Sequence, residues 1–279
     1  MTRLRDTFTE HVAAGDACEL ARGALLIARI AYPDLDPAPS LARLDALART
    51  ADAELRGSRD PLALAGWVFG ACGFRGNTAD YYDPRNSCLN DVLERRTGIP
   101  IALAVVLMEV GARRGVAVEG VGFPGHFLVR VQAGTGPRLL DPFAGGRALD
   151  GRELLARLRA YYEAGGGPPG SNLQRVLPQA LQASGRTAIL GRMLGNLLHV
   201  YVRRSDPRRA LAAADLLLVL TPDAPEPLRM RGLLYAQLEC HGSALADLER
   251  YLALAPRGPH AAEVRDRVAR LRDAGYTLH

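Results

Sequence analysis

Three side chains in the first half of the sequence could together activate a thiol: Cys88, His126 and Asp141. A cysteine near a helix start, a histidine on a strand edge and an aspartate on the next strand make up a Cys-His-Asp site. The imidazole takes the thiol proton, the carboxylate holds the imidazole in one tautomer, and the thiolate attacks an acyl carbon. The substrate class expected from this chemistry is an acyl compound, such as a glutamine amide or a peptide bond.

The histidine and the aspartate are predicted to meet at one end of a β-hairpin. Residues 134–137 read Gly-Thr-Gly-Pro, which favours a tight turn. Because the chain folds back at this turn, His126 and Asp141 come to the same open end of the hairpin, with the imidazole beside the carboxylate. The predicted strands are 116–121, 127–131 and 138–140.

Two consecutive helices are predicted just before these strands. Asn86 or Ser87 can cap a first helix that runs from about Cys88 to Arg96. A second helix is predicted to begin at Pro100 and to end at Gly115. Proline is tolerated in the first turn of a helix, and glycine commonly follows the last one. Its side chains are apolar on nearly every side, so it must be buried as the central helix of the domain. Further helices are predicted within 7–55 and at 61–69.

The second half of the sequence is predicted to be helical and repetitive. A tyrosine, an alanine and a proline recur after 34 residues, a period that matches tetratricopeptide repeats. The alternative is an unrelated helical bundle. The Asp150-x-x-Glu153 pattern predicts a capped helix before this region, ending near Tyr162. The matched residues are Tyr201, Ala210 and Pro222 with Tyr235, Ala244 and Pro256.

A glycine- and proline-rich stretch separates the two halves. We expect an α+β domain at 1–164, a linker at 165–172 and a tetratricopeptide-like helical domain at 173–279. Two recognisable repeats are fewer than an independent array usually needs, so the repeats are expected to dock on the first domain and to cover part of its cleft.

Composition narrows the possible partners. The net charge is +5, and the 35 basic residues are all arginines, which indicates a coding bias rather than a basic binding surface. The arginines are dispersed beside acidic residues, so we expect no nucleic-acid partner. No apolar run reaches the ~18 residues of a membrane span. The four cysteines lack metal or disulfide spacing, and no phosphate-binding motif is present, so we expect a reduced, cytoplasmic protein without metal or cofactor.

Five short motifs stand out in the first half: Phe74–Asn77, Asp83–Ser87, Leu93–Pro100, Phe123–Phe127 and Asp141–Gly146. Together they resemble the bacterial SirB-type family, in which a transglutaminase-like region precedes tetratricopeptide repeats. The resemblance implies a papain-like fold and places the family's histidine and aspartate at His126 and Asp141. It also implies a nucleophile at the start of the central helix, a position that Pro100 occupies, whereas Cys88 lies one helix earlier.

Two functions follow from this departure. The favoured one is a non-catalytic scaffold or regulator that binds a protein or peptide through the helical repeats or the cleft near His126. In that case Cys88 is a packing residue, and His126 and Asp141 form a structural pair. The alternative is a cysteine-dependent acyl transferase or peptidase that uses Cys88, His126 and Asp141. The two differ in whether Cys88 lies beside His126.

Overall fold

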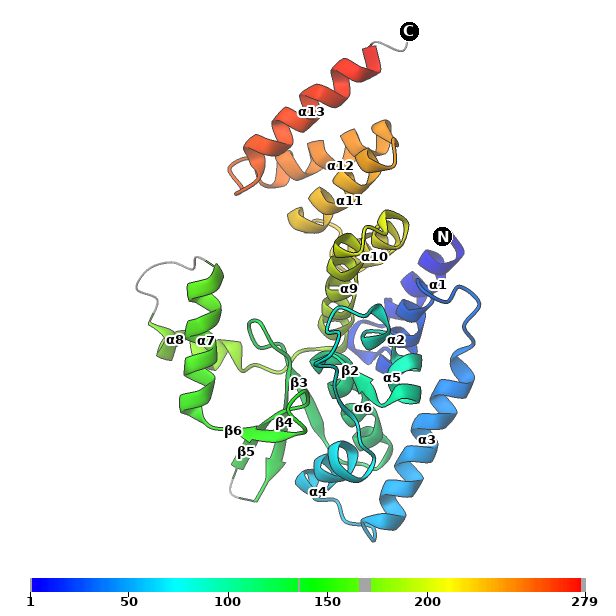
Figure 1. Cartoon of the computed structure of the whole chain (residues 1–279), viewed down its shortest axis with the longest axis vertical. Coiled ribbons are helices and arrows are strands. Elements are labelled where there is room, and N and C mark those ends of the chain that lie inside the picture. The colour runs from blue at the N-terminus through cyan, green and yellow to red at the C-terminus, as the bar shows by residue number, and fades with distance from the viewer. Residues whose placement is uncertain (1, 135, 166–171, 277–279) are drawn as a thin grey trace.

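A computed structural model describes residues 2–134, 136–165 and 172–276. Helices α1 to α6 form one side of the first half, and a small sheet with α7 and α8 lies beside them (Figure 1). Helices α9 to α13 continue from the junction of these parts and extend away from the sheet, with α13 farthest from it. The α+β domain followed by a tetratricopeptide-like helical region, predicted from the sequence, is confirmed.

Prolines and aspartates set the starts of the N-terminal helices. Asp36 and Asp60 accept hydrogen bonds from the main-chain N–H of Ala38 and Leu62, both at 3.0 Å, so each caps a helix whose first residue is proline. The elements are α1 (Thr2–Val12), a 3-10 turn (Gly15–Ala17), α2 (Leu20–Ala28), α3 (Pro37–Glu54), α4 (Pro61–Gly66) and a π-helical turn (Trp67–Ala71).

The central helix is α6 (Pro100–Arg113), and most of its side chains are buried, as predicted. It packs against α3, α4 and α5 (Leu89–Arg95) and against the sheet. Gly115 follows the helix with φ +68°, a left-handed conformation that glycine adopts without strain. Because α6 is covered on every side, its N-terminal end is held in a fixed place relative to the sheet.

The main sheet is antiparallel in the order β3-β4-β5-β6. Its register pairs Val121 with Leu128 on one face and Val129 with Leu140 on the other, so both faces of the sheet carry buried side chains. The first pair packs in the core with α7, and the second belongs to the main core with α6. Thr135, in the predicted turn, lies outside the described residues. The strands are β3 (Val118–Val121), β4 (Leu128–Ala133), β5 (Gly136–Asp141) and β6 (Arg147–Leu149), and a short parallel pair joins β1 (Arg75–Gly76) to β2 (Thr97–Gly98).

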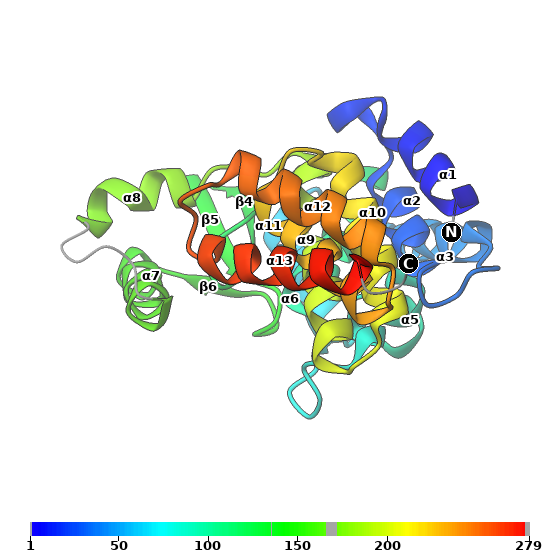
Figure 2. The same ribbon diagram turned by 90° about the horizontal axis from the view of Figure 1, so that it is seen from above.

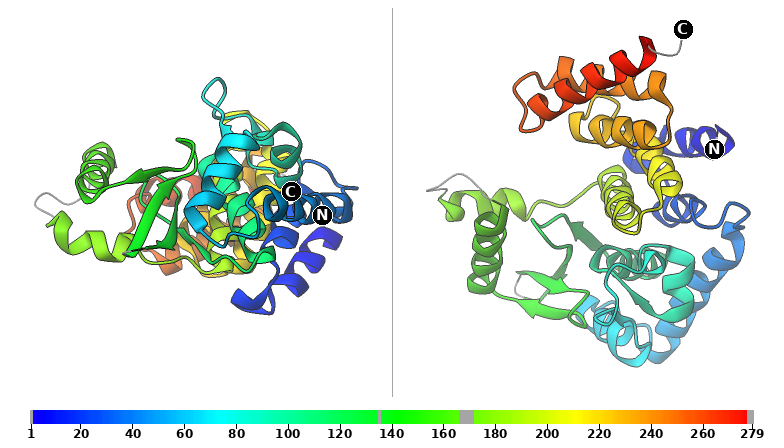
Figure 3. Two further views of the ribbon diagram at one scale, coloured as in Figure 1. Left: turned by 90° about the horizontal axis from the view of Figure 1, so that it is seen from below. Right: turned by 45° about the horizontal axis from the view of Figure 1, so that its top comes forward.

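Helices α7 (Gly151–Gly165) and α8 (Leu173–Ala180) pack together beside the sheet. The predicted capping box is present, since Asp150 Oδ1 accepts from the Glu153 N–H at 2.8 Å and Glu153 Oε2 accepts from the Asp150 N–H at 3.2 Å. Most of the predicted linker, residues 166–171, lies outside the described residues. Views from above and below place this pair on the side of the sheet away from α3 (Figures 2 and 3).

The helical region consists of α9 (Arg186–Arg203), α10 (Pro207–Leu220), α11 (Pro225–Gln237), α12 (His241–Leu254) and α13 (Ala261–Tyr276). Side chains of α9 and α10, and Leu234 of α11, belong to the same hydrophobic core as α2 and α6. A second core is formed by α11 to α13 with the end of α10. The repeats therefore dock on the first half through α9, α10 and part of α11. Gly232 lets α11 and α12 approach closely, because a Cβ there would lie 2.8 Å from Leu248.

Candidate functional site

His126 and Asp141 lie together at the open end of the hairpin. The Nε2 atom of His126 is 2.8 Å from Oδ1 of Asp141. The Asp141 residue ends β5, and a turn closed by the His126 N–H donating to the Phe123 carbonyl (3.0 Å) places the histidine just before β4. Gly125 has φ +70° in this turn. The predicted juxtaposition of imidazole and carboxylate is confirmed.

Asp141 is buried and accepts hydrogen bonds from three groups besides His126. Arg157 of α7 donates to its Oδ2 at 2.9 Å, and the N–H groups of Phe143 and Ala144 donate to Oδ1 at 3.0 and 3.2 Å. Burial raises the pKa of Asp141, but the hydrogen bonds and positive charges of His126 and Arg157 outweigh burial and lower this pKa to about 2. The carboxylate is therefore charged at neutral pH and fixed in place from several directions.

Cys88 lies in a different environment. It precedes α5 as the N-cap residue and is only 1% exposed. Within the described residues no hydrogen bond joins its thiol to His126 or Asp141. Burial, and then the nearby carboxylates of Asp91 and Asp83, raise the pKa of Cys88 to about 12. The structure thus brings together two of the three predicted site residues, and the thiol is protonated at neutral pH.

Pro100 is the first residue of α6 and is buried. The resemblance assigns the nucleophile to this position, and a proline side chain carries no group that could attack an acyl carbon. Its ring occupies the first helical turn, where the missing N–H removes no helical hydrogen bond. Pro100 therefore fits the start of the central helix but supplies no nucleophile there.

Two arginines near the pair come from helices outside the sequence motifs. Arg157 contacts Asp141 directly. Arg192 of α9 donates through Nη2 to the carbonyls of Phe123 and His126, at 2.8 and 2.5 Å, and its guanidinium lies 5.6 Å from the centre of the Phe127 ring. Sequence reasoning missed both residues, because nothing local distinguishes them from other arginines on helix faces and only the packing of α7 and α9 brings them here.

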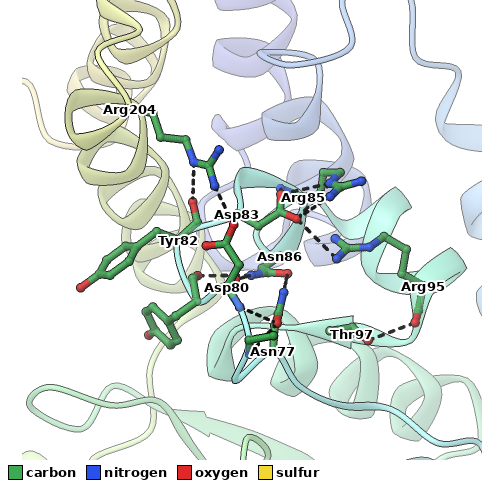
Figure 4. Close-up of polar contacts among 11 residues, drawn as sticks. Asn77, Asp80, Tyr82, Asp83, Arg85, Asn86, Arg95, Thr97 and Arg204 are labelled. Atoms are coloured by element: carbon green, nitrogen blue, oxygen red, sulfur yellow. Dashed lines mark hydrogen bonds and ion pairs between the residues drawn. The ribbon is translucent and has the colours of Figure 1, made fainter.

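The segment between β1 and α5 is fixed by a network of buried amides (Figure 4). Asn86 is fully buried, accepts from Asn77 Nδ2 at 3.0 Å and donates to the carbonyls of Asp80 and Tyr81 at 2.7 and 3.2 Å. These bonds define the shape of the segment that displays Tyr81 and Tyr82. The motif containing Asn86 therefore has a structural role that its polar character alone did not reveal.

Charged contacts tie the same segment to its neighbours (Figure 4). Asp83 accepts from Arg85 at 2.8 Å and lies 3.4 Å from Arg95 on α5. From the repeat side, Arg204 at the end of α9 donates to the Tyr82 carbonyl at 2.9 Å and to Asp80 at 2.8 Å. The segment is therefore held between the first domain and the first repeat helix.

The described residues contain no cluster of three His, Cys, Asp or Glu side chains arranged to hold a metal ion. Among the helices of the described ranges, none is long and apolar enough to cross a bilayer.

The fold and the site define a transglutaminase-like protein with C-terminal tetratricopeptide repeats. Residues 39–195 match the model of the transglutaminase-like superfamily, and residues 197–269 match a tetratricopeptide repeat model.

Relatives place the chain more narrowly. It is 43% identical to a UPF0162 protein of Xylella fastidiosa over 92% of this chain and 91% of the relative, and 32% identical to a UPF0162 protein of Vibrio cholerae over 95% and 97%. It is 25% identical to Protein SirB1 of Salmonella typhimurium over 90% and 91%. The chain belongs to this transglutaminase-like UPF0162 family, and the resemblance to SirB-type proteins is confirmed. No solved structure matches it significantly.

Proposed function

We propose that this protein is a non-catalytic, transglutaminase-like scaffold or regulator that binds a protein or peptide partner. The observation that carries the proposal is a histidine-aspartate pair to which no thiol is joined. His126 and Asp141 are 2.8 Å apart, and Cys88 is buried in another environment. An imidazole without an adjacent nucleophile has no covalent step to assist.

Two physical observations support the absence of a working nucleophile. A thiol whose pKa is raised to about 12 is almost wholly protonated at pH 7, and the thiolate is the reactive form. The first residue of the central helix is Pro100, which supplies no replacement nucleophile. The acyl-transfer alternative would require Cys88 to leave its buried position and reach His126.

A binding role is supported by the two kinds of surface that the chain presents. Tetratricopeptide repeats stack into extended surfaces that proteins use to hold partners. Tyr161, beside the turn that holds His126, and the neighbouring pair Tyr81 and Tyr82 are exposed although they are large aromatic residues. Exposed aromatic side chains at one place are typical of protein interfaces. The free cysteines of the described chain, of which Cys18, Cys72 and Cys88 are buried, fit action in the reducing cytoplasm.

The test is the site-resolved alkylation rate of Cys88 against pH, in the wild type and in His126→Ala. We expect slow labelling up to at least about pH 9 and no effect of the substitution, because burial and nearby carboxylates hold the thiol protonated. Cys240 is exposed and serves as the internal reference for an ordinary thiol. Fast labelling of Cys88 below pH 7 that disappears in His126→Ala would replace this proposal with the cysteine-dependent acyl transferase or peptidase.

A further inference from the structure

Arg192 is a charged group for which the described structure provides no opposite charge. Its Nη2 atom donates to two main-chain carbonyls, of Phe123 and His126, while Nε and Nη1 make no hydrogen bond within the described residues. Burial lowers the pKa of Arg192, which shows that its charge is partly removed from water. A partly buried charge without a counter-ion is costly, so its retention calls for an explanation.

Two other arginines of this region are paired with carboxylates. Arg157 is 2.9 Å from Asp141, and Arg204 is 2.8 Å from Asp80. The single carboxylate of Asp141 is already bonded to His126 and Arg157, so it does not offset Arg192. Arg192 therefore carries an uncompensated positive charge beside His126.

Aromatic side chains surround this charge. Tyr81 is 43% exposed and Tyr161 is 47% exposed, and both lie close enough to interact electrostatically with Arg192. Tyr161 packs over the turn before His126, because a Cβ on Gly125 would lie 2.8 Å from its ring. On the other side, the Tyr81 ring is 5.8 Å from that of Phe143. Arginine and tyrosine are enriched among the residues that dominate binding energy at interfaces.

We propose that Arg192, Tyr81 and Tyr161 form a docking site for an acidic peptide segment of a partner, with an aspartate or glutamate carboxylate bound to the Arg192 guanidinium. This inference rests on the proposed partner-binding function and names the chemistry of the partner. One uncompensated charge matches one carboxylate, and a planar guanidinium is suited to carboxylate recognition. The flanking rings cover the apolar parts of the bound segment.

The site is composite. Arg192 comes from α9, Tyr161 from α7 and Tyr81 from the segment held by Asn86 and Arg204. The carboxylate can be bound only while the first repeat helix is docked on the first domain. Recognition of the partner therefore requires both halves of the chain.

The experiment starts from a display library of short random peptides selected on the full-length chain, with affinities of enriched peptides measured by fluorescence anisotropy. We expect enriched peptides to carry an Asp or Glu whose replacement by Asn or Gln weakens binding at least about tenfold, the size of a charge-assisted hydrogen bond. Arg192→Gln should weaken the acidic peptide by a similar factor. In the double-mutant cycle the two losses should not add, because they remove the same contact.

Arg186→Gln is the matched control. Arg186 lies on the same helix and also donates to a main-chain carbonyl, that of Cys18 at 2.9 Å, but it is not part of the site. This variant should bind the acidic peptide as the wild type does. If Arg192→Gln does not fold, Tyr161→Ala and the Glu→Gln peptide on the wild-type chain decide, and each should weaken binding severalfold or more.

The possible failures are distinguishable. Enriched peptides that bind Arg192→Gln as well as the wild type, or that tolerate loss of their carboxylates, overturn the acidic site and leave partner binding in place. If selection on the wild type enriches no peptide, both the site and the peptide-binding function are overturned. Cleavage or acyl transfer of a bound peptide, detected by mass and abolished in Cys88→Ala, overturns the non-catalytic function.

Discussion

His126 Nε2 lies 2.8 Å from Asp141 Oδ1 in a site whose expected third member, a thiol, is elsewhere. The bond leaves the Nδ1 atom of the ring without a partner among the described residues. A histidine oriented by a charged carboxylate keeps one tautomer and one ring position whether or not chemistry follows. The geometry of a histidine-aspartate pair is therefore present as a fixed structural element beside an exposed surface.

The Asp141 carboxylate should make stability depend on pH. Its folded pKa is lowered from 3.8 to about 2, so its contribution is complete above about pH 4 and is lost as the pH falls towards 2. The shift corresponds to about 2 kcal/mol in the free energy of unfolding. Urea unfolding of the wild type and Asp141→Asn between pH 2 and 7 should show a difference that shrinks by about that amount at low pH.

Glu119→Gln is the control for this pH series. Glu119 forms an exposed ion pair with Arg130, and such pairs contribute about 0–1 kcal/mol. The free energy of unfolding of Glu119→Gln should stay within about 1 kcal/mol of the wild-type value at every pH. Parallel curves for the wild type and Asp141→Asn across the acid range would contradict the prediction.

Asn86→Ala should destabilise the protein much more than Asn90→Ala. Removing the Asn86 amide leaves the Nδ2 group of buried Asn77 without its partner, at about 1–3 kcal/mol for a buried unsatisfied group, and also removes two hydrogen bonds to the carbonyls of Asp80 and Tyr81. Asn90 lies four residues later, and its buried Oδ1 already lacks a partner. Chemical denaturation measures both effects, and equal losses of stability would disprove the role assigned to the amide network.

Gly76→Ala should be destabilising and Gly66→Ala should be neutral or stabilising. A Cβ on Gly76 would lie 2.5 Å from the Phe143 ring, which must move and in turn disturb the turn after Asp141. We expect a loss of about 1–3 kcal/mol, the usual effect of overpacking. At Gly66, in an exposed helical position with nothing within 4 Å, alanine should add about 0.4–1 kcal/mol. Thermal unfolding of both variants tests these two predictions. A Gly76→Ala variant that is as stable as the wild type would refute the first.

Arg231→Met should destabilise the repeats. Arg231 joins Asp247 of α12 (2.6 Å) to Asp215 of α10 (2.8 Å) in a largely buried cluster. Its loss leaves two carboxylates facing each other, and breaking such a pair costs about 3–5 kcal/mol. Arg250→Met, which removes an exposed pair with Asp223, should change stability by less than about 1 kcal/mol. Amide hydrogen exchange in α11 to α13 should be faster in Arg231→Met than in Arg250→Met. Similar protection in both variants would contradict the prediction.

Local sequence rules identified the elements that make the site. The all-apolar pattern after Pro100 identified the central helix, and the Asp150-Glu153 pattern identified the start of α7. Alternation and turn residues were sufficient to bring His126 beside Asp141, because hairpin register depends on residues close in sequence. The observed strands β3 to β5 differ from the predicted ones by at most two residues at their ends, where backbone pairing rather than side-chain type decides.

The positions of the other residues near the site depend on packing between segments that are far apart in the sequence. Cys88 was correctly expected at the start of a helix, but where that start points depends on how α5 packs against α2, α3 and α6. Arg192 is separated from His126 by 66 residues and reaches it only because α9 docks on the first domain. No pattern within either segment encodes that contact.

Helix α10 supplies side chains to both hydrophobic cores, with Leu216 in the first and Leu218 in the second. The boundary between sequence repeats therefore does not coincide with the boundary between packing units. Leu234 of α11 also belongs to the first core. In evolutionary terms, α12 and α13, whose described side chains join only the second core, could be gained or lost with little effect on the domain that holds His126, whereas α9 to α11 can change only together with the surfaces beneath them.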